Sequence, residues 1–275
     1  MSTFAQSNYA AHNYKNFRPV YPPQFYEYLK KHFVSKPNLA IDLGCGTGQA
    51  TFELANLAES VVGVDNSATM IDQARASSHP DNVSFRVGND RTFADGVSPD
   101  SVDLITVAEA AHWFDLAPFY KTAHEILRKD GILAIWGYCD QTIQEYPAVS
   151  DITEKYSYHP DYLGKFWDQG RDRLHHFYSD DKIPDTLFRD VEYRFNSSKE
   201  LSPQEKLEIS KQMTFKEFMD YFRTYSAYHT WLAARGGSEE DIFDRMQREI
   251  MDRTGLKLES TITVKWNTVY MFGRK

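Results

Sequence analysis

A glycine-rich segment carries the clearest chemical signal in this chain. Residues 44–48 read GCGTG and follow a short apolar run at residues 39–41. A buried strand that turns through glycines into a helix brings backbone N–H groups close to a ligand. The spacing G-x-G-x-G differs from the G-x-G-x-x-G of dinucleotide-binding folds, and no Lys-Ser or Lys-Thr follows as in a phosphate-binding P-loop. The segment therefore predicts either a ligand-binding loop or a tight structural turn.

An acidic residue ends the next apolar run. Residues 61–65 read VVGVD, which places Asp65 at the carboxyl end of a second predicted strand. In nucleoside-binding α/β sheets an acid at this position accepts hydrogen bonds from the ribose hydroxyls. Asp65 or Ser67 could instead cap the helix predicted over residues 67–77. The glycine loop just before this strand favours ribose binding.

The elements that must position these residues alternate along the first half of the chain. Apolar runs predict strands at 39–41, 61–65, 83–87, 101–107 and 132–138. Helical patterns lie at 24–33, 49–58, 67–77 and 116–128, and the last is predicted to stop at residues 129–131. This alternation predicts a doubly wound parallel sheet, whose ligands bind at the carboxyl ends of the strands. Residues 89–90 and 108–114 follow strands and are expected at that edge.

The strict alternation stops after residue 140. Strands are predicted at 191–195 and 261–272, and residues 203–256 are predicted to be largely helical. The N-terminal segment is aromatic and would form a lid or a surface strap. The expected organisation is an arm (1–23), a cofactor-binding α/β core (24–140), a cap insertion (141–187), a core strand (188–197), a helical cap insertion (198–258) and a C-terminal core strand (259–275).

Composition limits the class of protein. The chain has 275 residues, of which 41% are hydrophobic and 25% charged, as in ordinary globular proteins. A net charge of −8 argues against nucleic acid or membrane as a partner, whereas a small acidic metabolite needs only a local group of cations. The two cysteines indicate neither a disulfide framework nor a metal site. Without a signal-type or membrane-spanning apolar run, we expect a cytoplasmic protein with no obligate protein partner.

Several longer motifs resemble a known family. IDLGCGTG (41–48), VVGVD (61–65), AEAAHWF (108–114) and LRKDGILAIWGY (127–138) resemble class I S-adenosylmethionine-dependent methyltransferases. A narrower similarity, to microbial trans-aconitate methyltransferases, is carried by YKNFRPVY (14–21), AAHWFD (110–115), FWDQGRDRL (166–174), TYSAYHTW (224–231) and VKWNTVY (264–270). The resemblance implies a mostly parallel, seven-stranded Rossmann-like sheet with an antiparallel last strand and a helical cap formed by late insertions.

The resemblance also implies a cofactor, S-adenosyl-L-methionine, and a set of residues that bind it. The backbone of the glycine loop would approach the methionine moiety, and Asp42 would orient that loop and the amino group. Asp65 would take the ribose hydroxyls. The complete implied set is Asp42, Gly44, Cys45, Gly46, Asp65, Met70 on the adenine, Asn89 or Asp90 at the adenine edge, and Ala108 and Glu109 along the methionine tail. As an alternative, residues 89–90 would form an ordinary polar turn.

The implied acceptor is a small polycarboxylic acid such as trans-aconitate. Its carboxylate is ionised at neutral pH and needs no general base, so the enzyme has to hold it with fixed cations. His112 would contact the acceptor, act as a base toward a neutral acceptor, or make only a structural hydrogen bond. The acceptor-binding candidates are Tyr14, Arg18, His112, Trp113, Trp136, Tyr138, Arg171 (or its neighbour Arg173) and His229, of which the tryptophans and Tyr138 could equally be core.

Two further functions stay open at this point. A methyltransferase could act on a neutral oxygen or nitrogen acceptor, with His112 as the base and the arginines uninvolved. A protein could also bind the cofactor without catalysis, although the complete series of cofactor motifs argues against that reading.

Overall fold

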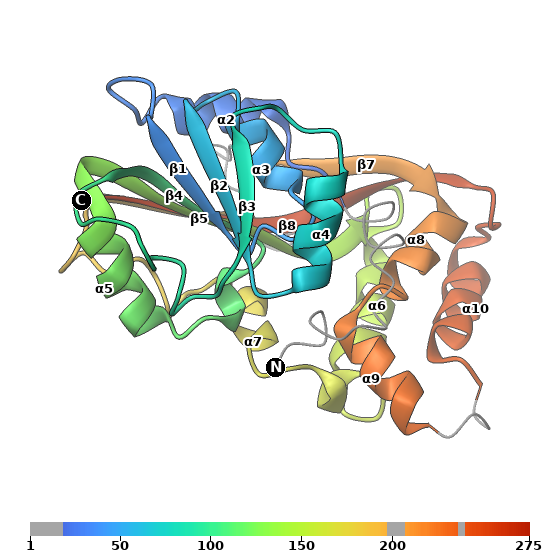
Figure 1. Ribbon diagram of the computed structural model, residues 1–275. Coiled ribbons are helices and arrows are strands. Elements are labelled where there is room, and N and C mark those ends of the chain that lie inside the picture. Colours follow the sequence, from blue (N-terminus) through green and yellow to red (C-terminus); the bar gives the residue numbers. More distant parts are fainter. Residues whose placement is uncertain (1–18, 197–206, 236–239) are drawn as a thin grey trace. The chain divides into compact units, whose positions relative to one another are not determined.

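The computed structural model describes residues 19–196, 207–235 and 240–275. It is a mixed α/β fold, which confirms the predicted class. The strands are β1 (Leu39–Leu43), β2 (Ser60–Asp65), β3 (Val83–Val87), β4 (Val102–Ala108), β5 (Leu127–Ile143), β6 (Arg189–Asn196), β7 (Ile209–Thr214) and β8 (Thr261–Arg274). The sheet has the order β3-β2-β1-β4-β5-β8-β6, and β7 pairs with β8 (Figure 1).

The strand pairs follow the expected topology. β1 lies between β2 and β4, and these pairs are parallel, as are β2–β3 and β4–β5. β6 and β7 each pair with β8 in antiparallel orientation. Because parallel strands end at one edge, the residues that follow β1, β2 and β4 meet there.

Contacts divide the chain into two compact units. The first, called the core unit, contains among the described residues 21–138, 172–196, 207 and 268–275. The second unit contains 19–20, 139–171, 208–235 and 240–267. Residues 172–187, expected in the first insertion, therefore belong with the core. The hydrogen bond from the Tyr120 hydroxyl to the carbonyl oxygen of Asp181 is one contact that holds them there.

The core unit contains several helices beside the sheet strands. They are α2 (Pro23–Lys30), α3 (Gln49–Leu54), α4 (Ala68–Ala76), η2 (Ala111–Trp113), α5 (Leu116–Ile126) and α7 (Arg171–His175), whose first residue belongs to the second unit. α3 and α4 contact β2, and α4 also contacts β3 (Figure 1). The side chain of Ser67 accepts a hydrogen bond from the backbone N–H of Met70 and so caps α4. The cap that the sequence left open between Asp65 and Ser67 is therefore Ser67.

Aromatic side chains fill part of the core unit. The indole of Trp136 is fully buried and meets the rings of Tyr21, Phe25 and Tyr26 in edge-on contacts. Such contacts add to the stabilisation that burial alone supplies. The high aromatic content of the chain is thus used at least partly for core packing.

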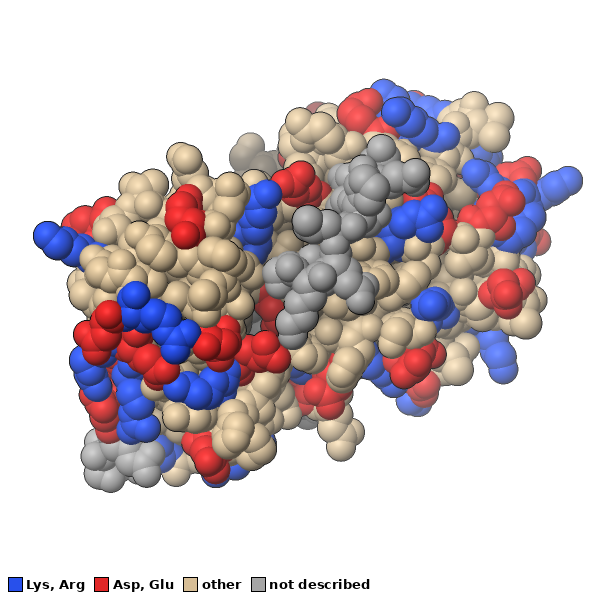
Figure 2. All heavy atoms as spheres, turned by 180° about the vertical axis from the view of Figure 1, so that it is seen from behind, with Lys and Arg blue, Asp and Glu red and all other residues tan. Residues whose placement is uncertain are grey.

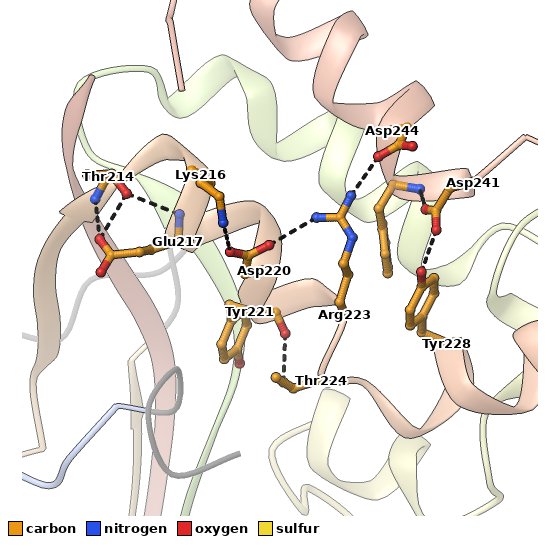
Figure 3. A network of polar contacts seen from close by, with 11 residues as sticks. Thr214, Lys216, Glu217, Asp220, Tyr221, Arg223, Thr224, Tyr228, Asp241 and Asp244 are labelled. Carbon is orange, nitrogen blue, oxygen red and sulfur yellow. Dashed lines mark hydrogen bonds and ion pairs between the residues drawn. The ribbon is translucent and has the colours of Figure 1, made fainter. Parts of the chain in front are cut away.

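The second unit is mainly helical. Its helices are η3 (Pro147–Val149), α6 (Ser150–Tyr158), η4 (Gly164–Phe166), α8 (Phe215–Phe222), α9 (Ser226–Ala234) and α10 (Ile242–Thr254). α8 starts with a capping box between Thr214 and Glu217. Arg223, just after α8, donates to Asp220 and to Asp244 of α10, so one guanidinium links the two helices (Figure 3).

One sequence-based assignment of secondary structure was wrong and a second was incomplete. The helix expected over 116–128 ends at Ile126, and residues 129–131 lie inside β5 rather than in a helix stop. Backbone hydrogen bonds of Asp130 and Gly131 with Lys275 join this segment to the chain end after β8, and Asp130 has φ +66° there. The region 203–256 also contains a strand, β7, which pairs with β8 over residues 261–266.

Charged side chains are mixed on the surface. Acidic and basic groups lie beside one another on the face drawn in Figure 2, and its described residues form no extended basic stripe. Exposed pairs such as Arg253–Asp151 contribute little to stability, because water and salt screen their charges. Within the described part of the chain, no helix combines the length and the apolar character needed to cross a membrane.

Candidate active site

The glycine loop follows β1 and adopts left-handed backbone geometry. The φ angles of Gly44, Gly46 and Gly48 are +74°, +54° and +92°. The N–H of Gly44 donates to the carbonyl oxygen of Val64 at 2.7 Å. A Cβ atom added to Gly44 would lie closer than 3.0 Å to the Cβ of Ala110, whereas one added to Gly46 would meet no atom of the described residues within 4 Å. The loop therefore packs against the segment after β4 at Gly44 and is open at Gly46.

Asp65 lies at the end of β2, as predicted, and holds this loop. One carboxylate oxygen accepts from the N–H of Gly46 at 2.8 Å, and the other accepts from the N–H of Ser67 at 2.8 Å. Burial raises the pKa of Asp65, which these backbone hydrogen bonds partly offset. An ionised carboxylate offers about four acceptor positions. The carboxylate therefore keeps acceptor capacity for ribose hydroxyls.

Asp42 does not lie on the surface of the loop. It is fully buried, and its two oxygens accept from the hydroxyls of Thr51 at 2.6 Å and Thr106 at 2.7 Å. Burial raises the pKa of Asp42 to about 6, against the effect of these two hydrogen bonds. Asp42 therefore links β1, α3 and β4 beneath the loop, rather than reaching a ligand from its surface.

The residues expected near the adenine fall in two places. Met70 is buried on α4. The side-chain oxygen of Asn89 accepts from the N–H groups of Arg91 and Thr92, which is the pattern of a polar turn. A carboxylate oxygen of Asp90 accepts from the N–H of Asp115. Residues 89–90 thus form the ordinary turn that the sequence left as an alternative, and adenine contact stays a prediction.

The turn after β4 contains a strained residue. Glu109 follows the half-buried Ala108 and has φ +56°, a rare value for a residue with a side chain. Its N–H donates to the carbonyl oxygen of Trp136 at 2.8 Å, and its carboxylate accepts from the N–H of Tyr138 at 2.7 Å. Glu109 thus adds two hydrogen bonds between the turn after β4 and the middle of β5.

His112 is buried in the short helix η2 that follows. Its Nδ1 lies 3.3 Å from the hydroxyl of Tyr178, and its ring contacts the half-buried Trp113 at 4.6 Å between centroids. Tyr178 was not among the predicted residues. No sequence signal marks it, because it lies in a region of mixed patterns, 66 positions from His112.

The aromatic candidates Trp136 and Tyr138 are buried in the core unit, and both rings contact Tyr21. The indole nitrogen of Trp136 has no hydrogen-bond partner among the described residues. Its surroundings are those of a core residue, and a role of Trp136 in acceptor binding stays a prediction.

Arg171 lies in the second unit and is also buried. One Nη atom donates to the hydroxyl of Tyr158 at 2.7 Å and lies 3.5 Å from the carboxylate of Asp140. The guanidinium also stacks on the ring of Trp167, 4.9 Å from its centroid. Burial acts to lower the pKa of Arg171, but Tyr158 and Asp140 outweigh it, so the net direction is upward and the group stays charged. Its Nε finds no acceptor among the described residues.

Three other cationic candidates have different surroundings. Arg173, in the core unit, donates to the carbonyl oxygen of Phe114 at 2.7 Å and pairs with Asp181. His229 is half-buried on α9 of the second unit, and burial lowers its pKa. Arg18 lies outside the described residues, as does Tyr14. Among the described residues no group of His, Cys, Asp and Glu could hold a metal ion.

Comparison with known proteins identifies the family. Residues 36–182, just over half of the chain, match the family model of a methyltransferase domain. This chain belongs to that methyltransferase family. A protein of Dictyostelium discoideum named as a methyltransferase is 32% identical over 224 residues, which cover 81% of this chain and 77% of the relative. A probable S-adenosylmethionine-dependent methyltransferase of Saccharomyces cerevisiae is 26% identical over all of this chain and 98% of its own length.

Solved methyltransferase structures share the fold. A protein from Anaeromyxobacter dehalogenans, assigned as a type II methyltransferase, aligns with a TM-score of 0.74 and 26% identity over 94% of this chain and 98% of that one. A Haemonchus contortus phosphoethanolamine N-methyltransferase in complex with S-adenosylhomocysteine aligns with a TM-score of 0.51 and 16% identity, over 99% of this chain and 60% of that one. At that identity the second likeness concerns the fold alone. This methyltransferase thus has relatives that span nearly its whole length.

Proposed function

We propose that this enzyme transfers the methyl group of S-adenosyl-L-methionine to a carboxylate oxygen of a small polycarboxylic acid such as trans-aconitate. Methyl transfer from S-adenosylmethionine is the activity of the family. The acceptor class is our proposal. The motifs that resemble trans-aconitate methyltransferases support it, and so does the chemistry of one buried cation, Arg171.

The core unit fits the cofactor. When bound, S-adenosylmethionine supplies an electrophilic methyl group on a positively charged sulfonium. No atom of the described residues would lie within 4 Å of a Cβ on Gly46, which supports a ligand against the loop backbone there. Asp65 keeps acceptor capacity for hydroxyl groups beside its backbone hydrogen bonds. Asp42 and Glu109 hold the surrounding backbone and would act by keeping this loop and the turn after β4 in place.

A carboxylate acceptor needs no acid or base catalysis from the protein. It is ionised at neutral pH, so no side chain has to remove a proton from it. The protein must exclude water and hold one oxygen in line with the methyl group. Such positioning can lower a barrier by roughly 7–11 kcal/mol. A second carboxylate of the acceptor can be held by a cation, which fixes the orientation of the first.

Arg171 is the cation that we propose for this role. Its guanidinium is buried and charged, and it presents five N–H donors in a fixed plane that matches a carboxylate. Asp140 and Tyr158 engage one nitrogen, while Nε is not used by any described acceptor. Because a buried donor without a partner is costly, an acceptor oxygen at this position would be favourable.

An acceptor panel tests the proposal. Release of S-adenosylhomocysteine is measured with di- and tricarboxylic acids beside neutral alcohols and amines of similar size. We expect turnover with trans-aconitate or a close polyacid and none with the neutral compounds. Turnover confined to the neutral acceptors would overturn the carboxylate proposal and favour the alternative in which His112 acts as a base.

A further inference from the structure

We propose that Tyr178 is a positioning residue for the methyl acceptor. In this assignment its hydroxyl donates a hydrogen bond to Nδ1 of His112, so that the neutral imidazole carries its hydrogen on Nε2 and donates it to the acceptor carboxylate. The inference rests on the proposed function, because it names a residue that serves the same acceptor.

The position of His112 relative to the glycine loop supports the assignment. η2 begins directly after Ala110, whose Cβ occupies the space that a side chain on Gly44 would need. Phe114, at the end of the same turn, also lies within 4 Å of that position. His112 is therefore carried by the turn that packs against the loop proposed to hold the cofactor.

Tyr178 is held rigidly. Its side chain is 1% exposed, and it has φ +55° next to Phe177 with φ +54°. Two adjacent residues with side chains in the left-handed region are uncommon, and strain of this kind clusters at functional sites. The N–H groups of Phe177 and Tyr178 donate to the carbonyl oxygens of Leu174 and Arg173 at 2.9 and 2.7 Å. These bonds keep the strained geometry and aim the ring.

A second contact ties the same segment to the turn of His112. Arg173 donates from Nη1 to the carbonyl oxygen of Phe114 at 2.7 Å, and its Nε pairs with Asp181 at 3.3 Å. The Tyr120 hydroxyl donates to the carbonyl oxygen of Asp181 at 2.8 Å. These contacts hold the backbone of the His112 turn independently of the Tyr178 hydroxyl. Removal of that hydroxyl should therefore affect the protonation and orientation of the His112 ring more than the backbone of the turn.

The tautomer decides what His112 can do. A neutral histidine has one N–H and one lone pair on its two ring nitrogens. If Nδ1 accepts from Tyr178, Nε2 carries the hydrogen and cannot accept a proton, so the neutral ring is a donor and not a base. A donor suits a carboxylate, because hydrogen bonds to ionised acceptors are stronger than neutral ones. A hydroxyl acceptor would need the opposite tautomer.

The test compares Tyr178→Phe with Tyr120→Phe. The control also removes one buried hydroxyl from the same region, but that hydroxyl bonds to Asp181 and not to His112. The 15N chemical shifts of the histidine rings report which nitrogen is protonated, and the signals of His112 are assigned by their loss in His112→Gln. Binding of S-adenosylhomocysteine and the KM and kcat for the acid acceptor are measured on both variants.

We expect protonated Nε2 in the wild type and loss of that preference in Tyr178→Phe. The KM for the acid should rise about tenfold, as for the loss of one hydrogen bond, with cofactor affinity unchanged. Tyr120→Phe should leave the His112 signals unchanged. Protonation at Nδ1 in the wild type would overturn the proposal even if Tyr178→Phe does not fold, and so would unchanged His112 signals in that variant. Protonated Nε2 could also be found in an enzyme that turns over neutral acceptors alone. That result would confirm the tautomer of His112, but it would overturn both the proposed function and the role of His112 toward a carboxylate.

Discussion

The carboxylate of Asp65 accepts a hydrogen bond from the backbone N–H of Gly46 at 2.8 Å, across 19 positions of sequence. The bond joins the end of β2 to the loop after β1. The side chain proposed for the ribose therefore also shapes the loop proposed for the methionine moiety. Loss of this carboxylate should affect both parts of the cofactor site together.

Replacement of Asp65 by alanine should weaken cofactor binding. The change removes the acceptor of the Gly46 N–H and the proposed acceptor of the ribose hydroxyls, so we expect the Kd of S-adenosylhomocysteine to rise at least about tenfold. Isothermal titration calorimetry measures it. Ser67→Ala is the matched control, because it removes only the cap of α4 and should cost about 1 kcal/mol of stability without a change in Kd. Equal Kd values for Asp65→Ala and the wild type would contradict the assignment.

The packed and the open side of the glycine loop predict different outcomes for alanine substitution. Gly44→Ala combines φ +74° with a clash against Ala110, whereas Gly46→Ala has φ +54° and open space. Gly255, which ends α10, has the same φ of +74°, and a Cβ there would meet no atom of the described part of the chain within 4 Å. We expect Gly255→Ala and Gly46→Ala to cost about 1–2 kcal/mol each and Gly44→Ala clearly more.

Only Gly46→Ala among the two milder variants should also weaken cofactor binding, because its new methyl group would point into the space assigned to the ligand. Urea unfolding and calorimetry on the three variants check both statements. A Gly46→Ala protein with normal affinity would show that the ligand does not approach this side of the loop.

The buried carboxyl of Asp42 predicts that its contribution to the free energy of unfolding depends on pH. Burial raises its pKa from 3.8 to about 6, so the folded protein binds a proton that the unfolded chain has released between these values. This contribution to stability is therefore largest at low pH, falls as pH rises from about 4 to 6, and stays at its lowest above pH 6. The change is on the order of 3 kcal/mol.

The variant Asp42→Asn isolates this contribution, since the amide keeps the shape of the side chain and does not titrate. As pH rises from 4 to 7, the free energy of unfolding of the wild type should fall relative to that of Asp42→Asn. Urea unfolding of both proteins at the two pH values measures it, and a difference that does not depend on pH would refute the raised pKa.

Replacement of Arg171 by glutamine should reduce use of the acid acceptor by about 100-fold in kcat/KM, the range for the loss of a charged hydrogen-bonded contact. It also removes the cation beside Asp140, which should destabilise the second unit by about 2 kcal/mol. Adding Asp140→Asn should restore stability but not activity, and this separates the two effects. Arg223→Gln serves as control, because Arg223 bridges Asp220 and Asp244 on the same unit. Recovery of activity in the double variant would assign Arg171 a purely structural role.

Local patterns were sufficient to predict much of the fold. Strand β3 has the predicted bounds of 83–87, and the apolar runs before the glycine loop and before Asp65 are the strands β1 and β2. The glycine loop could be recognised because only glycine adopts three positive φ values so closely spaced without strain. These features depend on residues that are neighbours in sequence.

Features that depend on distant contacts could not be predicted. β7 has the buried residues Ile209 and Met213 four positions apart, a spacing that also fits a helix, and its strand form comes from pairing with β8. α5 ends early because Leu127 pairs with Val102. In the candidate site, the partners of His112 and of Arg171 are Tyr178 and Asp140, which lie 66 and 31 positions away, and no local pattern links them.

The central claim, methylation of a carboxylate oxygen, is tested most directly by the stability of the product toward base. The enzyme is incubated with trans-aconitate and S-adenosylmethionine that carries an isotopic label in its methyl group, and the product is treated with alkali. A methyl ester hydrolyses, so the account predicts that the label leaves the product as volatile methanol. Label that stays on a non-volatile product after alkali would show transfer to a carbon, nitrogen or ether oxygen and would contradict the account.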